Sequence, residues 1–79
     1  MKKVLVLDDE KELLDLWQWH FKLWGEKVEL FTGTSGVQGI ELMMDHTFDL
    51  IITDYEMPEM GGLEFIQQVR AGNNPTPIF

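Results

Sequence analysis

Three short apolar runs, spaced regularly along the chain, restrict its fold more than any other feature of the sequence. Each run is rich in branched residues and lacks the polar alternation of a strand with one wet face, which indicates strands covered on both faces. The segments between the runs are helix-length, as parallel strands require of their connections. This alternation predicts an α/β fold: a parallel sheet with right-handed crossovers and helices on both faces. The predicted strands are residues 4–7, 28–31 and 50–52.

Helical patterns occupy the segments that separate or follow these strands. In the first segment, apolar residues recur at intervals of four, four and three, which places them on one stripe of a helix that faces the core. Residues 63–69 carry a similar pattern, and residues 76–79 resemble the start of a fourth strand. The stripe of the first helix comprises Leu13, Trp17, Phe21 and Trp24, with Leu16 alongside, and Gly25 is expected to end this helix.

The second predicted helix runs from about residue 35 to residue 45. Ser35 and Gln38 have the spacing of a capping box at its start. Gly39 lies inside it and costs about 1 kcal/mol relative to Ala in a helix interior. We therefore expect this helix to be the least secure element.

Composition excludes several classes of protein. The 79 residues include 6 Lys+Arg and 14 Asp+Glu, a net charge of −8 without the basic cluster that phosphate contacts need, so we expect no nucleic-acid binding by this chain. The absence of Cys excludes disulfides and thiolate sites and fits a reducing compartment. The apolar run before Asp8 has only four residues, too few for a signal peptide or a membrane span. We expect one small, soluble, cytoplasmic domain that does not associate with membranes.

Acidic residues follow two of the predicted strands where each strand ends. Asp8 and Asp9 come directly after the first strand, and Asp54 follows the third after a single threonine. Because ligand sites in open parallel sheets lie beyond the carboxyl ends of the strands, we expect these three carboxylates to converge. A hard divalent cation such as Mg²⁺ would offset their charge, and an aspartate beside it can attack phosphorus. The alternative is that such carboxylates only cap the following helices, as Asp9 could.

The motifs around these acids resemble the receiver domain of two-component response regulators. The first is Val-Leu-Val-Leu-Asp-Asp-Glu at residues 4–10. The second is Asp-Leu-Ile-Ile-Thr-Asp-Tyr-Glu-Met-Pro-Glu-Met-Gly-Gly-Leu-Glu-Phe-Ile at residues 49–66. The match runs through all 79 residues in the right order, and the two motifs together are highly specific. The resemblance implies a flavodoxin-like receiver fold, truncated after the third helix at the start of a fourth strand.

The resemblance also implies a role for each acidic residue. Asp54 would be the phosphoacceptor, taking a phosphoryl group from a histidine kinase or a small acyl phosphate. Asp9 would bind Mg²⁺ directly and Asp8 largely through water, while Asp54 and the backbone carbonyl of Glu56 complete the ligands. Such a module accepts phosphate on itself and is not a turnover enzyme. Pro58 and Gly62 would shape the loop that follows the acceptor.

The chain departs from the family in its length. A complete receiver has five βα units, so residues 1–79 correspond to an amino-terminal part of roughly three units. The Ser/Thr that ends strand four and the Lys that ends strand five would be missing, and we expect phosphorylation to be weak or absent. An uncovered edge at strand three or four would be a template for another chain. We therefore expect a homodimer, formed by edge pairing or segment exchange.

Two other functions are open from the sequence. In the first, the acids are vestigial and the chain is a self-associating fragment that serves as an assembly module. In the second, the chain is a phosphohydrolase of the haloacid dehalogenase type. That family has Asp-x-Asp after its first strand, whereas Asp8 and Asp9 are adjacent here.

The aromatic residues and histidines are assigned mostly to packing. Trp17 and Trp24 lie on the predicted core stripe, whereas Trp19 points elsewhere and is expected to be exposed or to contact a partner. His20 and His46 share no spacing typical of metal ligands. We therefore expect no metal site built on histidine.

Overall fold

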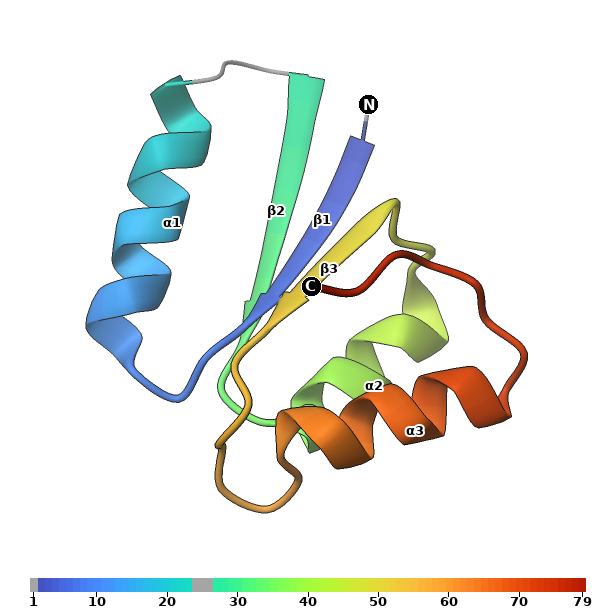
Figure 1. The fold of residues 1–79 in the computed structure, drawn as a ribbon. Coiled ribbons are helices and arrows are strands. Elements are labelled where there is room, and N and C mark those ends of the chain that lie inside the picture. The colour runs from blue at the N-terminus through green and yellow to red at the C-terminus, as the bar shows by residue number, and fades with distance from the viewer. Residues whose placement is uncertain (1, 24–26) are drawn as a thin grey trace.

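The chain folds into a parallel three-stranded sheet with helices on both faces (Figure 1). The computed structural model describes residues 2–23 and 27–79. Strand β1 is central, with β2 and β3 parallel to it on either side, so the predicted α/β class is confirmed. The elements are β1 (Lys2–Leu7), α1 (Lys11–Leu23), β2 (Val28–Gly33), α2 (Gly36–Asp45), β3 (Leu50–Thr53) and α3 (Gly62–Ala71).

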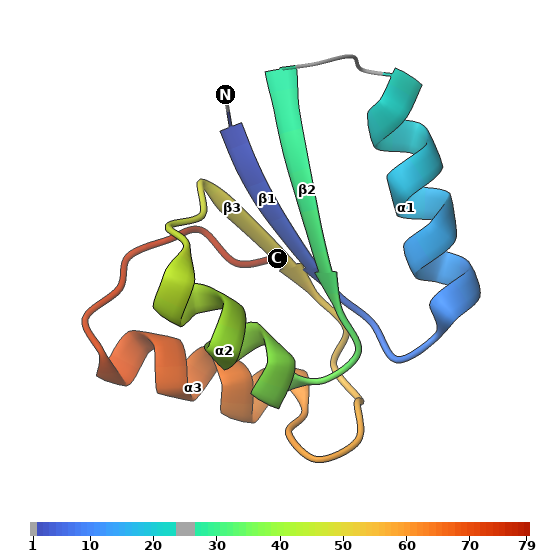
Figure 2. The ribbon, with the colours of Figure 1, turned by 180° about the vertical axis from the view of Figure 1, so that it is seen from behind.

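The uninterrupted apolar sequence of β1 is explained by burial on both of its faces. Alternate residues of a strand point to opposite faces. Leu5 and Leu7 join the core beneath α2 and α3, whereas Val4 and Val6 join a separate core beneath α1. Figures 1 and 2 show α1 on one side of the sheet and α2 with α3 on the other. One face is thus covered by two helices and the opposite face by one.

Helix α1 buries part of the predicted stripe, Phe21 and Trp17, but the stripe is shifted toward Leu14. Its buried residues are Leu14 and Phe21, and Trp17 is half-buried with its ring edge-on to Phe21 at 5.9 Å between centroids. Leu13 and Leu16, which were expected to face the core, are exposed. Trp24 and Gly25 lie outside the described residues.

The physical reason is that apolar residues surround most of this helix. At 100° per residue, the polar side chains of α1 gather on one narrow strip, apart from Glu12 and His20. Two overlapping stripes therefore satisfy helical spacing, and contact with β1 and β2 selects the one through Leu14. The narrow polar strip consists of Lys11, Asp15, Gln18 and Lys22.

Helix α2 begins with half of the predicted capping box. Ser35 Oγ accepts a hydrogen bond from the Gln38 backbone N–H at 3.2 Å. Gln38 does not return the bond to Ser35, because its Oε1 accepts from the Thr34 N–H at 2.8 Å instead. Both backbone donors are thereby satisfied and the helix start is defined.

Gly39 is a point of close contact between α2, the sheet and α3. A Cβ at this position would lie 2.6 Å from Leu7 Cδ1 and 2.7 Å from Phe65 Cε1, and both of those side chains are buried. The absence of a side chain thus lets α2 pack closely on the sheet and on α3. The expectation that Gly39 makes α2 the least secure element considered only helix propensity, and these contacts add a packing reason for glycine at this position.

We predict that Gly39→Ala destabilises the protein although alanine is the better helix former. The gain in propensity is about 1 kcal/mol, but overpacking a core costs typically 1–3 kcal/mol. A net loss of roughly 1 kcal/mol is expected in urea unfolding followed by circular dichroism. Gly72→Ala is the matched control, since nothing lies closer than 3.6 Å to a Cβ at that position. A higher unfolding midpoint for Gly39→Ala would contradict this account.

The carboxyl-terminal residues return to the sheet beside β3, as the C label shows in Figure 1. Ile51 N–H donates to Pro77 O at 2.9 Å, and Ile51 O accepts from the Phe79 N–H at 2.9 Å. Thr53 N–H donates to Phe79 O, also at 2.9 Å. The start of a fourth strand is thus present as a parallel bridge between Ile51 and Ile78. It covers part of the β3 edge, which was one of the two edges expected to be open.

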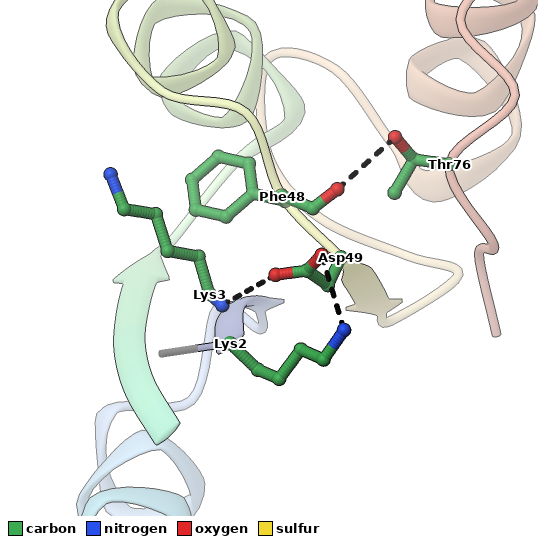
Figure 3. A network of polar contacts seen from close by, with 5 residues as sticks. All are labelled: Lys2, Lys3, Phe48, Asp49 and Thr76. Atoms are coloured by element: carbon green, nitrogen blue, oxygen red, sulfur yellow. Dashed lines mark hydrogen bonds and ion pairs between the residues drawn. The ribbon is translucent and has the colours of Figure 1, made fainter. Parts of the chain in front are cut away.

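Polar contacts hold the amino-terminal end of the sheet together (Figure 3). Lys3 N–H donates to Asp49 Oδ2 at 2.8 Å, and Lys2 Nζ lies 4.0 Å from Asp49 Oδ1. The buried Thr76 donates from its hydroxyl to Phe48 O at 3.4 Å and to Asn74 Oδ1 at 2.6 Å. These bonds guide the chain from α3 back to the edge of β3. None of the helices in the described ranges is both long and apolar enough to span a bilayer.

Candidate functional site

Backbone hydrogen bonds beyond the regular strands bring Asp8 and Asp54 to one end of the sheet. Asp8 N–H donates to Gly33 O at 3.0 Å, which joins it to the end of β2. Asp54 N–H donates to Leu7 O at 2.8 Å, which joins it to the end of β1. Each aspartate is thus the first residue after its strand and is still held by the neighbouring strand. Their positions follow from the parallel register rather than from loop flexibility.

The three predicted carboxylates converge at this end of the sheet. Asp8, Asp9 and Asp54 each offer one carboxylate oxygen, and these oxygens all lie within 4.8 Å of one another. Two nearby glutamates, Glu10 and Glu56, contribute no carboxylate to this group. Glu56 lies two residues after Asp54 in the exposed loop that leads to α3.

Local hydrogen bonds orient two of these carboxylates. Asp8 Oδ1 accepts from the Glu10 N–H at 2.9 Å, and Asp54 Oδ1 accepts from the Tyr55 N–H at 2.8 Å. Glu10 O then accepts the first bonds of α1, from the N–H groups of residues 13 and 14. Within residues 2–23 and 27–79, the Asp9 side chain accepts no such bond, so capping does not account for Asp9.

The donor set fits a hard divalent cation. Three carboxylates this close repel one another, and no lysine or arginine in the described part of the chain forms an ion pair with them. Among the described lysines and arginines, Lys2 forms an ion pair with Asp49. This pair lies at the end of the sheet opposite to the acidic cluster. Carboxylate oxygens without nitrogen or sulfur ligands are what Mg²⁺ prefers.

A glycine holds the loop after Asp54 against the sheet. A Cβ at Gly62 would overlap the Asp54 carbonyl oxygen, and the Gly62 N–H donates to Tyr55 O at 2.8 Å. The expected shaping role of Gly62 is therefore visible as a close approach of the backbone. Met60 O also accepts from the Gly36 N–H at 2.8 Å, which ties this loop to the start of α2.

Two features of this loop escaped the sequence interpretation. Glu59 has a positive φ of 67°, a left-handed conformation that a non-glycine residue adopts infrequently. The bond from Gly36 to Met60 joins residues that are distant in sequence. Neither the positive φ nor this hydrogen bond can be recognised from the local sequence, because both depend on how α2 and α3 pack.

Comparisons with known proteins agree with this geometry. The model of the response regulator receiver domain matches residues 4–79. Response regulator SaeR of Staphylococcus aureus is 33% identical over 70 residues, which are 89% of this chain and 29% of that protein. The chain spans less than a third of the length of the curated relatives it matches.

Solved receiver structures share the fold. The Francisella response regulator 1452 receiver domain superposes with a TM-score of 0.89 at 26% identity, covering 99% of this chain and 63% of that one. TrrA of Thermotoga maritima, solved with Mg²⁺ and BeF, has a TM-score of 0.81 at 32% identity, covering 91% and 61%. TrrA in complex with the histidine kinase ThkA has a TM-score of 0.86 at 31% identity, covering 99% and 66%. The chain belongs to the family of response regulator receiver domains, the phosphoacceptor modules of two-component signalling.

Proposed function

We propose that Asp54 accepts a phosphoryl group. Its Oδ1 is engaged by the Tyr55 N–H, so Oδ2 is the oxygen placed to attack phosphorus. The new O–P bond forms as the bond from phosphorus to the donor breaks, and the donor leaves with that electron pair. The donor is the phosphohistidine of a histidine kinase or a small acyl phosphate, and the product is an aspartyl phosphate.

The residues proposed to hold Mg²⁺ are Asp8, Asp9 and Asp54, with the backbone carbonyl of Glu56. Bound there, Mg²⁺ would neutralise charge on the carboxylates and on the transferring phosphoryl group. The carboxylates of Asp8 and Asp9 provide the negative charge that retains the cation beside Asp54. The convergence of three carboxylate oxygens within 4.8 Å is the observation that supports this proposal most.

The partner and location belong to the same proposal. A histidine kinase is proposed as the phosphodonor, because the similar protein TrrA was solved in complex with one. The chain is a substrate of phosphotransfer, located in the cytoplasm, and it does not contact nucleic acid. Its acidity supports the last point, since a net charge of −8 repels phosphate backbones.

Phosphorylation of this chain is proposed to be slow. In its described residues no cation pairs with the acidic cluster, whereas phosphoryl transfer depends on positive charge near the transferring group. The 79 residues cover 61–66% of the receiver chains cited above, and their described part supplies the acidic cluster without a paired cation.

We predict that Asp9→Asn weakens Mg²⁺ binding on the order of tenfold or more, since even in water one unit charge near a divalent ion is worth over 1 kcal/mol at about 4 Å. Saturable Mg²⁺ titration, followed by tryptophan fluorescence, measures this. Asp45→Asn is the control, because Asp45 is an exposed aspartate of α2 outside the cluster. Equal affinities for both variants would contradict the proposed ligand set.

A second candidate function is an assembly module that is not phosphorylated. The exposed apolar side chains of α1 favour it, because contiguous apolar surface marks an interaction site. Absence of saturable Mg²⁺ binding in folded protein would support this alternative over the phosphoacceptor. In either case we propose a homodimer. Pairing of sheet edges, one of the two modes expected from the sequence, would use residues 77–79. These residues pair with β3 on one side and form the outer edge of the sheet on the other.

A further inference from the structure

The loop between Asp54 and α3 meets the start of α2 at one buried point. Gly36, the first residue of α2, is buried, and its N–H donates to Met60 O at 2.8 Å. A Cβ at Gly36 would lie 2.7 Å from Met60 Cγ, 2.8 Å from Met60 O and 2.9 Å from Met60 Cβ. Gly36 does not have a left-handed φ, so glycine is required here by space rather than by backbone conformation. We call residues 36 and 60 the α2–loop contact.

The contact joins two segments that are held with different firmness. At the start of α2, Ser35 is only 1% exposed, and Gly39 packs against two buried side chains of the sheet and α3. In the loop, by contrast, residues 55–56 and 58–59 are exposed. A methyl group added at Gly36 is therefore accommodated by movement of the loop, because α2 is already packed closely on its other side.

The loop carries a proposed metal ligand that has no anchor of its own. The backbone carbonyl of Glu56 is proposed to complete the Mg²⁺ ligands, but Glu56 makes no hydrogen bond among the described residues. Its position depends on its neighbours. The Gly62 N–H donates to Tyr55 O, Met57 packs against the core, and the α2–loop contact holds the far side of the loop. Mg²⁺ demands near-ideal octahedral geometry with short bonds, so a small displacement of one ligand oxygen weakens binding.

We propose that Gly36 is a positioning residue for the magnesium site. Its closest contacts are with Met60 rather than with a proposed ligand, so it acts through the loop that presents the Glu56 carbonyl to the cation. In return, Met60 O accepts from one of the N–H groups that a helix leaves unpaired at its start. The loop and α2 thus stabilise each other. This inference rests on the proposed Mg²⁺ site and extends it to α2.

Calorimetric titration with Mg²⁺ tests the positioning role. Gly36→Ala is expected to raise the Kd for Mg²⁺ about tenfold, the lower end of the roughly 10–100-fold loss seen when groups behind metal ligands are changed. Gly39→Ala is the matched control, because it adds the same methyl group to the same helix but against Leu7 and Phe65 instead of the loop. This control is expected to lose stability without a comparable change in Kd. Circular dichroism verifies that each protein is folded during the titration.

Amide hydrogen exchange of the parent chain is a second measurement, and it needs no variant. Coupling between binding and the α2–loop contact is reciprocal, so saturating Mg²⁺ is expected to slow exchange of the Gly36 N–H. The control is the Gly39 N–H, which donates to Ser35 O within α2 and should slow less. If Gly36→Ala does not fold, this measurement alone decides.

The outcomes distinguish the positioning role from the proposed site. A parent chain that binds no Mg²⁺ overturns both. Equal Mg²⁺ affinities for folded Gly36→Ala and Gly39→Ala, or equal slowing of the two amides, overturns only the positioning role and leaves the three carboxylates as the site. A selective loss of affinity in Gly36→Ala, together with selective slowing at Gly36, supports it.

Discussion

Asp54→Asn is expected to abolish covalent phosphoryl uptake by this chain. The parent protein, incubated with acetyl phosphate and Mg²⁺, should slowly acquire a single phosphoryl adduct in its intact mass. The amide keeps the shape of the side chain and its acceptor for the Tyr55 N–H but lacks a nucleophilic carboxylate. We therefore expect no adduct on the variant, rather than a reduced amount.

Asp45→Asn is the control for this experiment, and it should be modified as the parent is. Omitting Mg²⁺ should suppress the adduct on the parent chain, since the three carboxylates converge without a paired lysine or arginine among the described residues. An adduct retained in Asp54→Asn would place the acceptor elsewhere. A folded parent chain that acquires none would favour the assembly module over the phosphoacceptor.

Phe65→Ala is expected to unfold a large fraction of the protein. Phe65 is fully buried at 0% exposure, in the core cluster that joins α3 to β1 and β3, and it also touches the space beside Gly39. Phenylalanine-to-alanine changes in cores cost about 3–5 kcal/mol. A chain of 79 residues has a total stability of roughly 4–12 kcal/mol, so this loss removes much or all of it.

Urea unfolding followed by circular dichroism measures this effect. Leu63→Ala, two residues away on the exposed side of α3, is the matched control and should change the unfolding midpoint little. Equal midpoints for the two variants would mean that α3 does not anchor the fold. Loss of α3 would also release the loop after Asp54, because Gly62 begins this helix and contacts the Asp54 backbone.

The sequence predicted the acidic cluster because its geometry is nearly local. Each aspartate follows a strand directly, and the carboxyl ends of parallel strands meet at one edge of the sheet. Knowledge of the strand ends was therefore sufficient to bring Asp8, Asp9 and Asp54 together. The order of the strands could be predicted from two observations: the alternation of strands and helices, and the resemblance to receiver domains.

Predictions from the sequence failed where one element had to be placed against another. The stripe assigned to α1 was right for Phe21 and Trp17 and wrong for Leu13 and Leu16, which are exposed, whereas Leu14 is buried in their place. Gly39 was interpreted by helix propensity alone, although its contacts with Leu7 and Phe65 decide its effect. The sequence left undecided whether the open edge would belong to strand three or strand four, and the pairing of residues 77–79 with β3 decided this.

The difference between the features that the sequence predicted and those that it did not has a physical basis. The sequence by itself determined which segments are strands and helices and which carboxylates meet, because polarity and spacing along one segment carry that information. Only the tertiary structure decided which side of α1 is buried, how closely α2 approaches α3, and which apolar surface stays exposed. Those outcomes depend on the shape and coverage of neighbouring elements, since a helix that is apolar around most of its circumference does not encode the face that its neighbours will cover.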